Sequence, residues 1–308
     1  MTGSLLAIEH LRVDFPEVVA VNDLSLAVAA GDVCGLIGPN GAGKTTTMRA
    51  ISGLQETTRG SVRVANHELA SEPVELKRQL GFMPDFCPVY DQLTALEFLE
   101  HFARAYNVPN RAVRIFECLE TTWLTEKRNA LCEELSRGMK QRLVLAKTLL
   151  PDPQVLLLDE PASGLDPLGR IELRKILLQL RDSGKAVLIS SHILSELSGF
   201  CNTAAIMERG RLVKCGTIAE LGREMDSRKM SVKWRANGDA ALEILKSASV
   251  KNLESSNLGA TFNFDGSTDA LDDLLKSLVT RGVRISEWRG VGDDLEQIFL
   301  QSGAKELM

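Results

Sequence analysis

The sequence predicts an α/β protein with a second, smaller α+β domain at its C-terminal end. Continuous apolar runs, typical of strands buried on both faces of a parallel sheet, alternate with helical patterns over roughly the first two thirds of the chain. After Gly222 the pattern changes to a different order of short strands and helices. We therefore expect two domains, over residues 1–222 and 223–308.

The composition is that of an ordinary globular protein. Of 308 residues, 44% are hydrophobic and 25% are charged, and the net charge is −5. A dedicated nucleic-acid binder would more often be basic, so we expect no nucleic-acid partner. The start of the chain has no secretory pattern and no uncharged apolar run of about 18 residues occurs, so we expect neither secretion nor a membrane span. Six scattered cysteines without a C-x-x-C pair indicate buried thiols in a reducing cytosol.

A phosphate-binding loop is indicated near the N-terminus. The apolar run over residues 33–37 predicts a buried strand, and residues 44–52 predict a helix with Gly53 at its C′ position. Between them the sequence matches G-x-x-x-x-G-K-[S/T], in the strand-loop-helix context that this pattern requires. The residues of the loop are Gly38, Pro39, Asn40, Gly41, Ala42, Gly43, Lys44 and Thr45.

The glycines of this loop would let consecutive backbone N–H groups turn inward toward a polyphosphate, at the positive end of the following helix. We expect Lys44 to reach the β and γ phosphates and the hydroxyl of Thr45 to hold Mg²⁺. The alternative is a glycine-rich turn with a surface lysine. Many kinases and GTPases also carry such a loop, so further residues are needed to choose a function.

Charged and polar residues follow two further predicted strands. Residues 155–158 are apolar and end in Asp159 and Glu160, and residues 186–189 end in two serines and His192. Sheets of this class bind ligands at the carboxyl ends of their strands. We expect Asp159 to hold the hydration shell of Mg²⁺ and Glu160 to orient or deprotonate an attacking water. The alternatives are an acidic cap after a buried strand and a structural histidine.

A helical subdomain is predicted between these motifs, over about residues 92–150. Thr94 and Glu97 form a capping-box pattern at its start. Further along, Leu-Ser-Arg-Gly-Met-Lys-Gln-Arg at residues 135–142 precedes a helix for which Ser136 is a natural N-cap. A serine hydroxyl and a glycine N–H at a helix N-terminus can bind an anion. The alternative for this segment is a capped helix and nothing more.

The segments after Gly222 alternate in the order strand, helix, strand, strand, helix, strand, which is the order of a ferredoxin-like sandwich. We expect its Trp234 and Trp288 to be core residues. The predicted segments are residues 230–235, 240–247, 250–254, 260–264, 270–280 and 283–288.

Five motifs in this order and spacing resemble the nucleotide-binding subunit of an ABC transporter: GPNGAGKTT, LSRGMKQR, LLLDEP, SGLD and SSH. The resemblance covers roughly residues 5–220. It implies a P-loop NTPase of the ABC cassette type, with a mixed sheet core and a helical subdomain, that binds ATP and Mg²⁺ and hydrolyses the ATP.

The resemblance also implies roles for individual residues. Phe15 matches the aromatic residue that stacks on adenine, although a core position in the first strand would also account for it. Thr46 matches the second hydroxyl of the phosphate loop. His192 matches the histidine that contacts the γ phosphate and holds the attacking water and Glu160 in place.

Three further residues are implied to act across a dimer. Ser136 and Gly138 match residues that hold the γ phosphate of ATP bound to the other subunit, so that the site is completed when two copies meet head to tail. Asp166 matches a loop that joins the two sites, although capping of the following helix would also explain it.

The sequence departs from the family pattern at three positions. Asp85 stands where most relatives have a glutamine that reads the metal and the water. A carboxylate there can ligate Mg²⁺, but it adds negative charge near the γ phosphate. Arg137 stands in place of the first glycine of the signature and Met139 in place of its glutamine. We expect the phosphate contact to survive, because Ser136 and Gly138 remain.

The expected function is that of an ATPase that drives a separate transmembrane permease, as a homodimer or with a closely related chain. We expect a cytoplasmic location on the inner face of the cell membrane. The forms GLIGPNGAGKTTTMRAISGL and DDLEQIFL resemble bacterial ABC-2 type exporters, so export is expected. The alternative is a soluble ABC ATPase that acts on DNA or the ribosome. A single phosphate loop, and only about 50 residues between Asp85 and Ser136, argue against this alternative.

Overall fold

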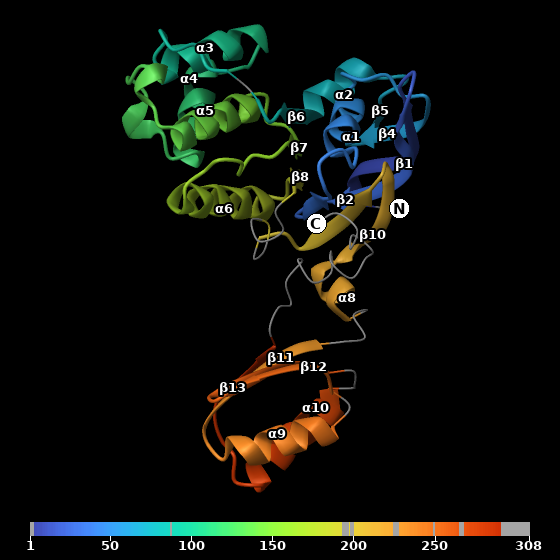
Figure 1. Cartoon of the computed structure of the whole chain (residues 1–308). Helices are drawn as coiled ribbons and strands as arrows, with labels where there is room; N and C mark the ends of the chain where they lie inside the picture. The colour runs from blue at the N-terminus through green and yellow to red at the C-terminus, as the bar shows by residue number, and fades with distance from the viewer. Residues whose placement is uncertain are drawn as a thin grey trace. The chain divides into compact units, whose positions relative to one another are not determined.

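The chain divides into two compact units, Met1–Ile218 and Ala219–Met308. In this computed structural model, the residues described are 3–86, 88–192, 197, 200–223, 228–248, 250–264 and 268–290. The first unit holds the predicted phosphate loop and the helical region, and the second holds the six C-terminal segments (Figure 1). The change of unit falls a few residues before Gly222, where the sequence pattern changes.

The first unit begins with an antiparallel sheet whose strands lie in the order β2-β1-β4-β5. Strand β1 alternates buried and exposed positions over part of its length, which is the pattern of a strand with one face on the core. The bounds are Ser4–Asp14 for β1, Val19–Ala29 for β2, Arg59–Val64 for β4 and His67–Glu68 for β5.

A six-stranded mixed sheet positions the site, with the order β10-β9-β3-β8-β7-β6. Strands β9, β3, β8, β7 and β6 run parallel, and β10 pairs with β9 antiparallel. Every residue of β3 and β7 is buried, which confirms the two apolar runs as central strands. The bounds are Val33–Ile37 for β3, Leu80–Met83 for β6, Val155–Leu158 for β7, Ala186–Ser191 for β8, Thr203–Glu208 for β9 and Arg211–Thr217 for β10.

Helix α1 (Lys44–Ile51) joins the two sheets into one core. Its buried Met48 and Ile51 belong to a cluster that also contains Leu6 and Val28 of the antiparallel sheet and Leu157 of the mixed sheet. Burying an aliphatic side chain of this size contributes roughly 1.5–3 kcal/mol. The start of α1, which follows the predicted loop, is therefore fixed by packing on both sides.

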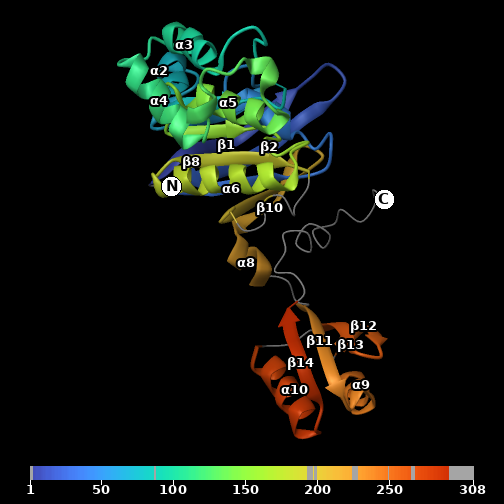
Figure 2. The same ribbon diagram turned by 90° about the vertical axis from the view of Figure 1, so that its left-hand side faces the viewer.

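The helical region follows β6, and the capping box predicted at its start is confirmed. The hydroxyl of Thr94 accepts from the backbone N–H of Glu97 at 3.2 Å, and the Glu97 carboxylate accepts from the N–H of Thr94 at 2.8 Å. Figure 2 shows these helices from a second side. The helices of the first unit after α1 are α2 (Pro73–Gln79), α3 (Ala95–Ala105), α4 (Arg111–Thr121), α5 (Arg137–Leu149) and α6 (Pro167–Asp182), with short 3₁₀ turns at Thr125–Lys127 and Cys132–Glu134.

The second unit contains the six predicted segments in the predicted order, after α8 (Ile218–Arg223). Its sheet has the antiparallel order β12-β13-β11-β14, and both helices cover one face of it (Figure 1). Trp234 is buried in its core and Trp288 packs against that core. Assignment to the ferredoxin-like class stays a prediction. The bounds are Arg228–Ala236 for β11, Gly238–Ser247 for α9, Val250–Ser256 for β12, Gly259–Phe264 for β13, Thr268–Thr280 for α10 and Arg284–Gly290 for β14.

Candidate active site

The predicted phosphate loop connects β3 to α1 and packs through its backbone. A Cβ atom on Gly38 would lie 2.2 Å from the carbonyl oxygen of Met207 in β9. Gly43 has φ +102°, and a Cβ there would lie 2.4 Å from the carbonyl oxygen of Ala20 in β2. Because neighbouring backbone lies so close, only glycine fits at these two positions. The loop therefore packs directly on β2 and β9.

The start of α1 presents unpaired backbone donors. The first backbone hydrogen bond of the helix runs from the N–H of Thr47 to the carbonyl of Gly43, at 2.8 Å. The N–H groups of Lys44, Thr45 and Thr46 therefore precede the first acceptor that the helix supplies. With the helix dipole, these donors form a site for an anion.

Lys44 is almost fully buried, at 6% exposure, and its Nζ is held by the loop itself. Nζ donates to the carbonyl of Gly38 at 2.7 Å and to that of Pro39 at 3.2 Å, and lies 3.7 Å from Oε1 of Glu160. Burial lowers the pKa of Lys44, while the carboxylates of Glu160 and Asp159 oppose that shift. These contacts hold the Lys44 amino group beside two loop carbonyls and the Glu160 carboxylate.

Glu160 follows β7 and takes a left-handed backbone conformation, with φ +48°. Its N–H donates to Oγ of Ser190 at 2.9 Å, and this hydroxyl donates to Oδ1 of Asp159 at 2.5 Å. Ser190 thus links the ends of β7 and β8 and holds the Asp159 carboxylate and the backbone of Glu160. The sequence pattern predicts only that Ser190 ends a strand, because its bridging role depends on β7 and β8 being neighbours.

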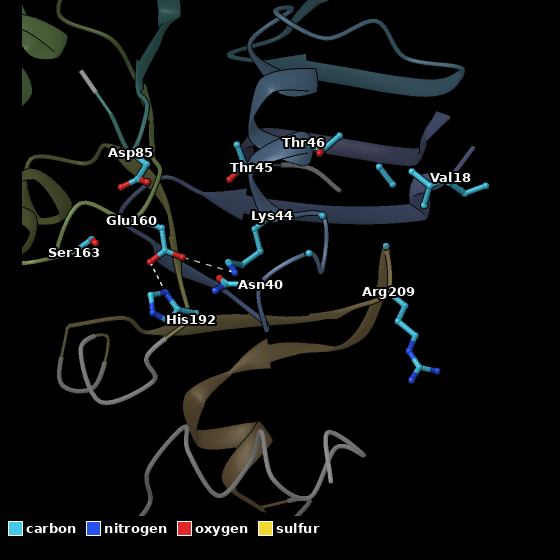
Figure 3. A pocket seen from close by; sticks show the side chains of 15 residues that line it. Val18, Asn40, Lys44, Thr45, Thr46, Asp85, Glu160, Ser163, His192 and Arg209 are labelled. Carbon is cyan, nitrogen blue, oxygen red and sulfur yellow. Dashed lines mark hydrogen bonds and ion pairs between the residues drawn. The ribbon is translucent and has the colours of Figure 1, made fainter. Parts of the chain in front are cut away.

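His192 follows β8, and its ring contacts Glu160. The Nδ1 atom lies 2.8 Å from Oε2 of Glu160, so the N–H tautomer at Nδ1 would donate to the carboxylate. Glu160 has only 13% of its side chain exposed, whereas 40% of the His192 ring is exposed. Figure 3 shows Glu160 reaching toward Lys44 with one oxygen and toward His192 with the other.

A cavity of about 650 Å³ brings many of the predicted residues together. Figure 3 shows its lining, with Asp85 and Ser163 near one end and Val18 and Arg209 near the other. The predicted residues that line it are Asn40, Gly41, Gly43, Lys44, Thr45, Thr46, Asp85, Glu160 and His192. The lining residues that sequence analysis missed are Val18, Val19, Ala20, Ser163, Arg209 and Gly210.

Phe15 does not line this cavity. It lies 41% exposed at a tight turn in which its N–H donates to the carbonyl of Val18 at 2.8 Å. Val18 and Val19, just after the turn, line the cavity instead, and Val18 is 60% exposed. No local sequence pattern marks this apolar end, because Val18 and Val19 reach the cavity only through the way the turn folds back. Stacking of Phe15 on adenine stays a prediction.

The residues expected to act across a dimer do not line the cavity. Ser136 and Asp166 are exposed and cap helices, as the alternative interpretation required. The Ser136 hydroxyl accepts from the N–H of Met139 at 3.3 Å, and Asp166 accepts from the N–H of Gly169 at 2.8 Å. Gly138 lies in the first turn of α5. The cross-dimer roles of these residues stay predictions.

The donors available for a metal ion are all oxygens. Thr45 and Asp85 line the cavity, and Asp159 lies beside it with 1% exposure. Within the described ranges, no group of three or more His, Cys, Asp or Glu residues is arranged to hold a metal ion. A hard cation that takes its remaining ligands from phosphate and water, as Mg²⁺ does, fits such a donor set. The free backbone N–H groups at the start of α1, next to glycines that leave no room for a side chain, likewise fit a polyphosphate.

The remaining loop residues lie behind the cavity surface. Gly38, Pro39 and Ala42 support its shape, since Ala42 is buried and its N–H donates to the carbonyl of Pro39 at 3.1 Å. A glycine cradle at a helix N-terminus, a buried lysine and a carboxylate with a histidine at adjacent strand ends define a P-loop nucleotide-binding protein.

Comparisons with known proteins identify the family of P-loop proteins to which the chain is similar. The ABC transporter domain family matches residues 21–163. An uncharacterized ABC transporter ATP-binding protein of Bacillus subtilis is 32% identical over 283 residues, which are 91% of this chain and 90% of that protein. The chain therefore belongs to the family of ABC transporter ATP-binding proteins. A solved ATP-binding subunit of an ABC transporter superposes with a TM-score of 0.65 at 30% identity, over 72% of this chain and 93% of that one.

Two further relatives match part of the chain. An uncharacterized ABC transporter ATP-binding protein of Synechocystis is 36% identical over 67% of this chain, and the match spans 58% of that relative's length. A Nod factor export ATP-binding protein of Cupriavidus pinatubonensis is 33% identical over 71% of this chain and 68% of that protein.

Family membership confirms the fold expected for the first unit, which is an ABC ATPase cassette. Nucleotide-binding domains of this family bind ATP, and the domain implies ATPase activity coupled to transport. Subunits of this kind generally dimerise and pair with transmembrane components. In the part of this chain that the structure describes, no helix has the length and apolar character needed to cross a bilayer.

Proposed function

We propose that the cavity binds Mg·ATP and that Glu160 and His192 direct its hydrolysis, in a subunit that drives a separate transmembrane permease. The observation that carries this proposal is the placement of Glu160. Its carboxylate lies between Lys44, 3.7 Å away, and His192, 2.8 Å away, beside the start of α1. One carboxylate thus contacts both a phosphate-binding group and a group that can hold a proton.

The phosphate loop binds and orients the polyphosphate. The N–H groups at the start of α1 donate to phosphate oxygens, and Lys44 exchanges its contacts with the loop carbonyls for contacts with phosphate. The hydroxyls of Thr45 and Thr46 lie at the same end of α1. Thr45, Asp85 and Asp159 would hold Mg²⁺, which would supply positive charge beside the phosphates.

Glu160 orients and deprotonates the attacking water, and His192 keeps the carboxylate in place. Because the Glu160 N–H is tied to Ser190 and its side chain is tied to His192, the carboxylate keeps one orientation. A positioned carboxylate in a largely buried site contributes roughly 10²–10⁴ to the rate of such a step.

We also propose that two copies meet head to tail. Ser136, Gly138 and Asp166 lie outside the cavity, at the start of α5 and α6, where a second copy can reach them. We assign ATP binding to residues 1–222, with the helical subdomain over about residues 92–150, and we propose that residues 223–308 are an accessory domain.

Export, rather than uptake, is the direction we propose. The support is the relative named for Nod factor export, together with the sequence forms shared with bacterial exporters. The proposed location is the inner face of the cell membrane, reached through the permease.

The test is the substitution Glu160→Gln, which removes the basic oxygen but keeps the size of the side chain. We expect turnover of ATP to fall by about 100-fold or more, while ATP binding measured by calorimetry stays within about twofold. The matched control is Glu75→Gln on α2, whose carboxylate lies on the surface near Arg78. Hydrolysis by Glu160→Gln at the wild-type rate would overturn the assignment.

A further inference from the structure

Arg137, the first residue of α5, contacts the segment that follows β7. Its Nη2 donates to the carbonyl oxygen of Ser163 at 3.1 Å. A Cβ atom on Gly164 would lie 2.2 to 2.4 Å from three atoms of the guanidinium group. The guanidinium therefore lies directly against the backbone of Gly164, which has φ +67°.

Stability of α5 does not explain an arginine at this position. The N-terminal end of a helix carries partial positive charge, so a cation in the first turn is unfavourable. Ser136 already caps the helix with its hydroxyl. What the side chain gains at this position is the contact with Ser163 and Gly164.

The contacted segment leads directly to Glu160. The N–H of Ser163 donates to the carbonyl of Glu160 at 3.0 Å and closes a turn. Glu160 begins this turn with φ +48°, and Ser163 itself lines the cavity. Two consecutive hydrogen bonds thus connect the start of α5 to the residue that carries the reactive carboxylate.

We propose that Arg137 is a positioning residue that makes the start of α5 and the Glu160–Gly164 turn move as one body. This inference rests on the proposed function, in which the start of α5 meets the nucleotide of a second copy while Glu160 acts on the nucleotide of its own copy. The arginine then couples the two nucleotide sites of the dimer within each chain. A glycine at this position could not make the contact.

A direct contact between Arg137 and the phosphate of a second copy is the competing role. The two roles differ in what they require of the side chain. A phosphate contact requires positive charge, which lysine also supplies. The positioning role requires a planar group that lies flat against Gly164 while donating to Ser163, and the ammonium group of lysine lacks that shape.

The first experiment compares Arg137→Ala and Arg137→Lys with the wild-type chain. We expect both variants to lower kcat by about fivefold to tenfold and to lower the Hill coefficient for ATP toward one. ATP affinity, measured by calorimetry in a Glu160→Gln background, should stay within about twofold. The control is Arg104→Ala on α3, another exposed arginine, which should leave all three quantities unchanged. Full activity of Arg137→Lys, or a large loss of affinity in Arg137→Ala, would overturn the positioning role.

The second experiment is a double-mutant cycle with Gly164→Ala. In the wild-type chain, two effects oppose the added methyl group: the positive φ of residue 164 and the clash with the Arg137 guanidinium. In the Arg137→Ala chain, only the backbone conformation opposes it. We therefore expect Gly164→Ala to lower the urea midpoint further when Arg137 is present than when it is absent. Equal shifts in both backgrounds would show that the contact does not form.

Failure of this inference differs from failure of the proposed function. The double-mutant cycle is measured by unfolding without nucleotide, so it tests the contact itself. Full activity of the Glu160→Gln variant would reject the proposed function. The double-mutant cycle could still show that Arg137 contacts Gly164. Conversely, an additive cycle together with an inactive Glu160→Gln chain rejects only the role of Arg137.

Discussion

At the scale of single residues, two glycines of the phosphate loop are required for different physical reasons. Gly41 and Gly43 both have positive φ, at +81° and +102°. A Cβ atom on Gly41 would meet nothing within 4 Å, whereas one on Gly43 would overlap the carbonyl of Ala20 and lie 2.8 Å from Cε of Met207. Gly41 is thus required for its conformation alone, and Gly43 for conformation and space.

This difference predicts unequal costs for two identical substitutions. We expect Gly43→Ala to lower the free energy of unfolding by at least about 2 kcal/mol, because strain and overlap add. Gly41→Ala should cost only about 1 kcal/mol, from its backbone conformation. Urea unfolding of both variants without nucleotide measures the two costs. Equal losses would mean that the contact of Gly43 with β2 can relax.

Single residues also show where sequence reasoning stops. Lys44, Glu160 and His192 could be placed at one site because each follows a strand in a recognisable pattern. Ser190 and Val18 carry no such pattern, because their contribution depends on which strands are neighbours and how a turn folds back. The contact of Arg137 with Ser163 joins residues 26 positions apart and could not be read from spacing.

At the scale of elements, the C-terminal end of α5 is held by a network of charges. Arg114 of α4 donates to the carbonyl of Leu149 at 2.7 Å and to Asp152 at 3.0 Å. Lys185, just before β8, donates to the same carboxylate at 2.8 Å. Asp152 therefore connects α4, the end of α5 and the approach to β8.

This network predicts a pH dependence of stability. Burial by itself raises the pKa of Asp152, but the hydrogen bonds and charges of Lys185 and Arg114 outweigh it, so the pKa is lowered in the folded chain. A lowered pKa stabilises the folded state above the pKa of the unfolded chain, about 3.9, and this contribution is lost as pH falls through the folded value. The difference in unfolding free energy between wild type and Asp152→Asn should therefore be present at pH 7 and shrink below about pH 4.

Unfolding of both chains in urea across this pH range measures the effect. Arg114→Ala supplies the control, because it removes one of the groups that lower the pKa and should reduce the same pH-dependent difference. A difference between wild type and Asp152→Asn that stays constant down to pH 3 would contradict the prediction.

Elements were the level at which sequence reasoning succeeded most often. The strands β3 and β7 have the predicted bounds, because runs buried on both faces carry a continuous apolar signal. The helices begin where capping residues stand, at Thr94, Ser136 and Asp166. Strand order in the mixed sheet has no such local signal, since it depends on contacts between distant parts of the chain.

At the scale of the whole molecule, each unit has a hydrophobic core of its own. The cluster that surrounds α1 contains residues of the first unit, and the cluster that contains Trp234 and Phe262 belongs to the second. A unit with its own core can unfold by itself.

We therefore expect two separate unfolding transitions for the full chain. The substitution Trp123→Phe on the first unit, where the ring is 43% exposed, leaves tryptophan only at positions 234 and 288 of the second unit. Fluorescence of this variant in urea should then report the second unit alone, while far-UV circular dichroism reports both. The midpoints of the two signals should differ. Superimposable curves would show that the units unfold together.

The wedging of α1 between two sheets has a mechanical consequence. Side chains of both sheets grip the same eight-residue helix, and its leading end faces the anion site. A force along the axis of α1 is therefore transmitted to both sheets. Any shift of α1 that accompanied nucleotide binding would therefore be opposed by both sheets or would displace them together.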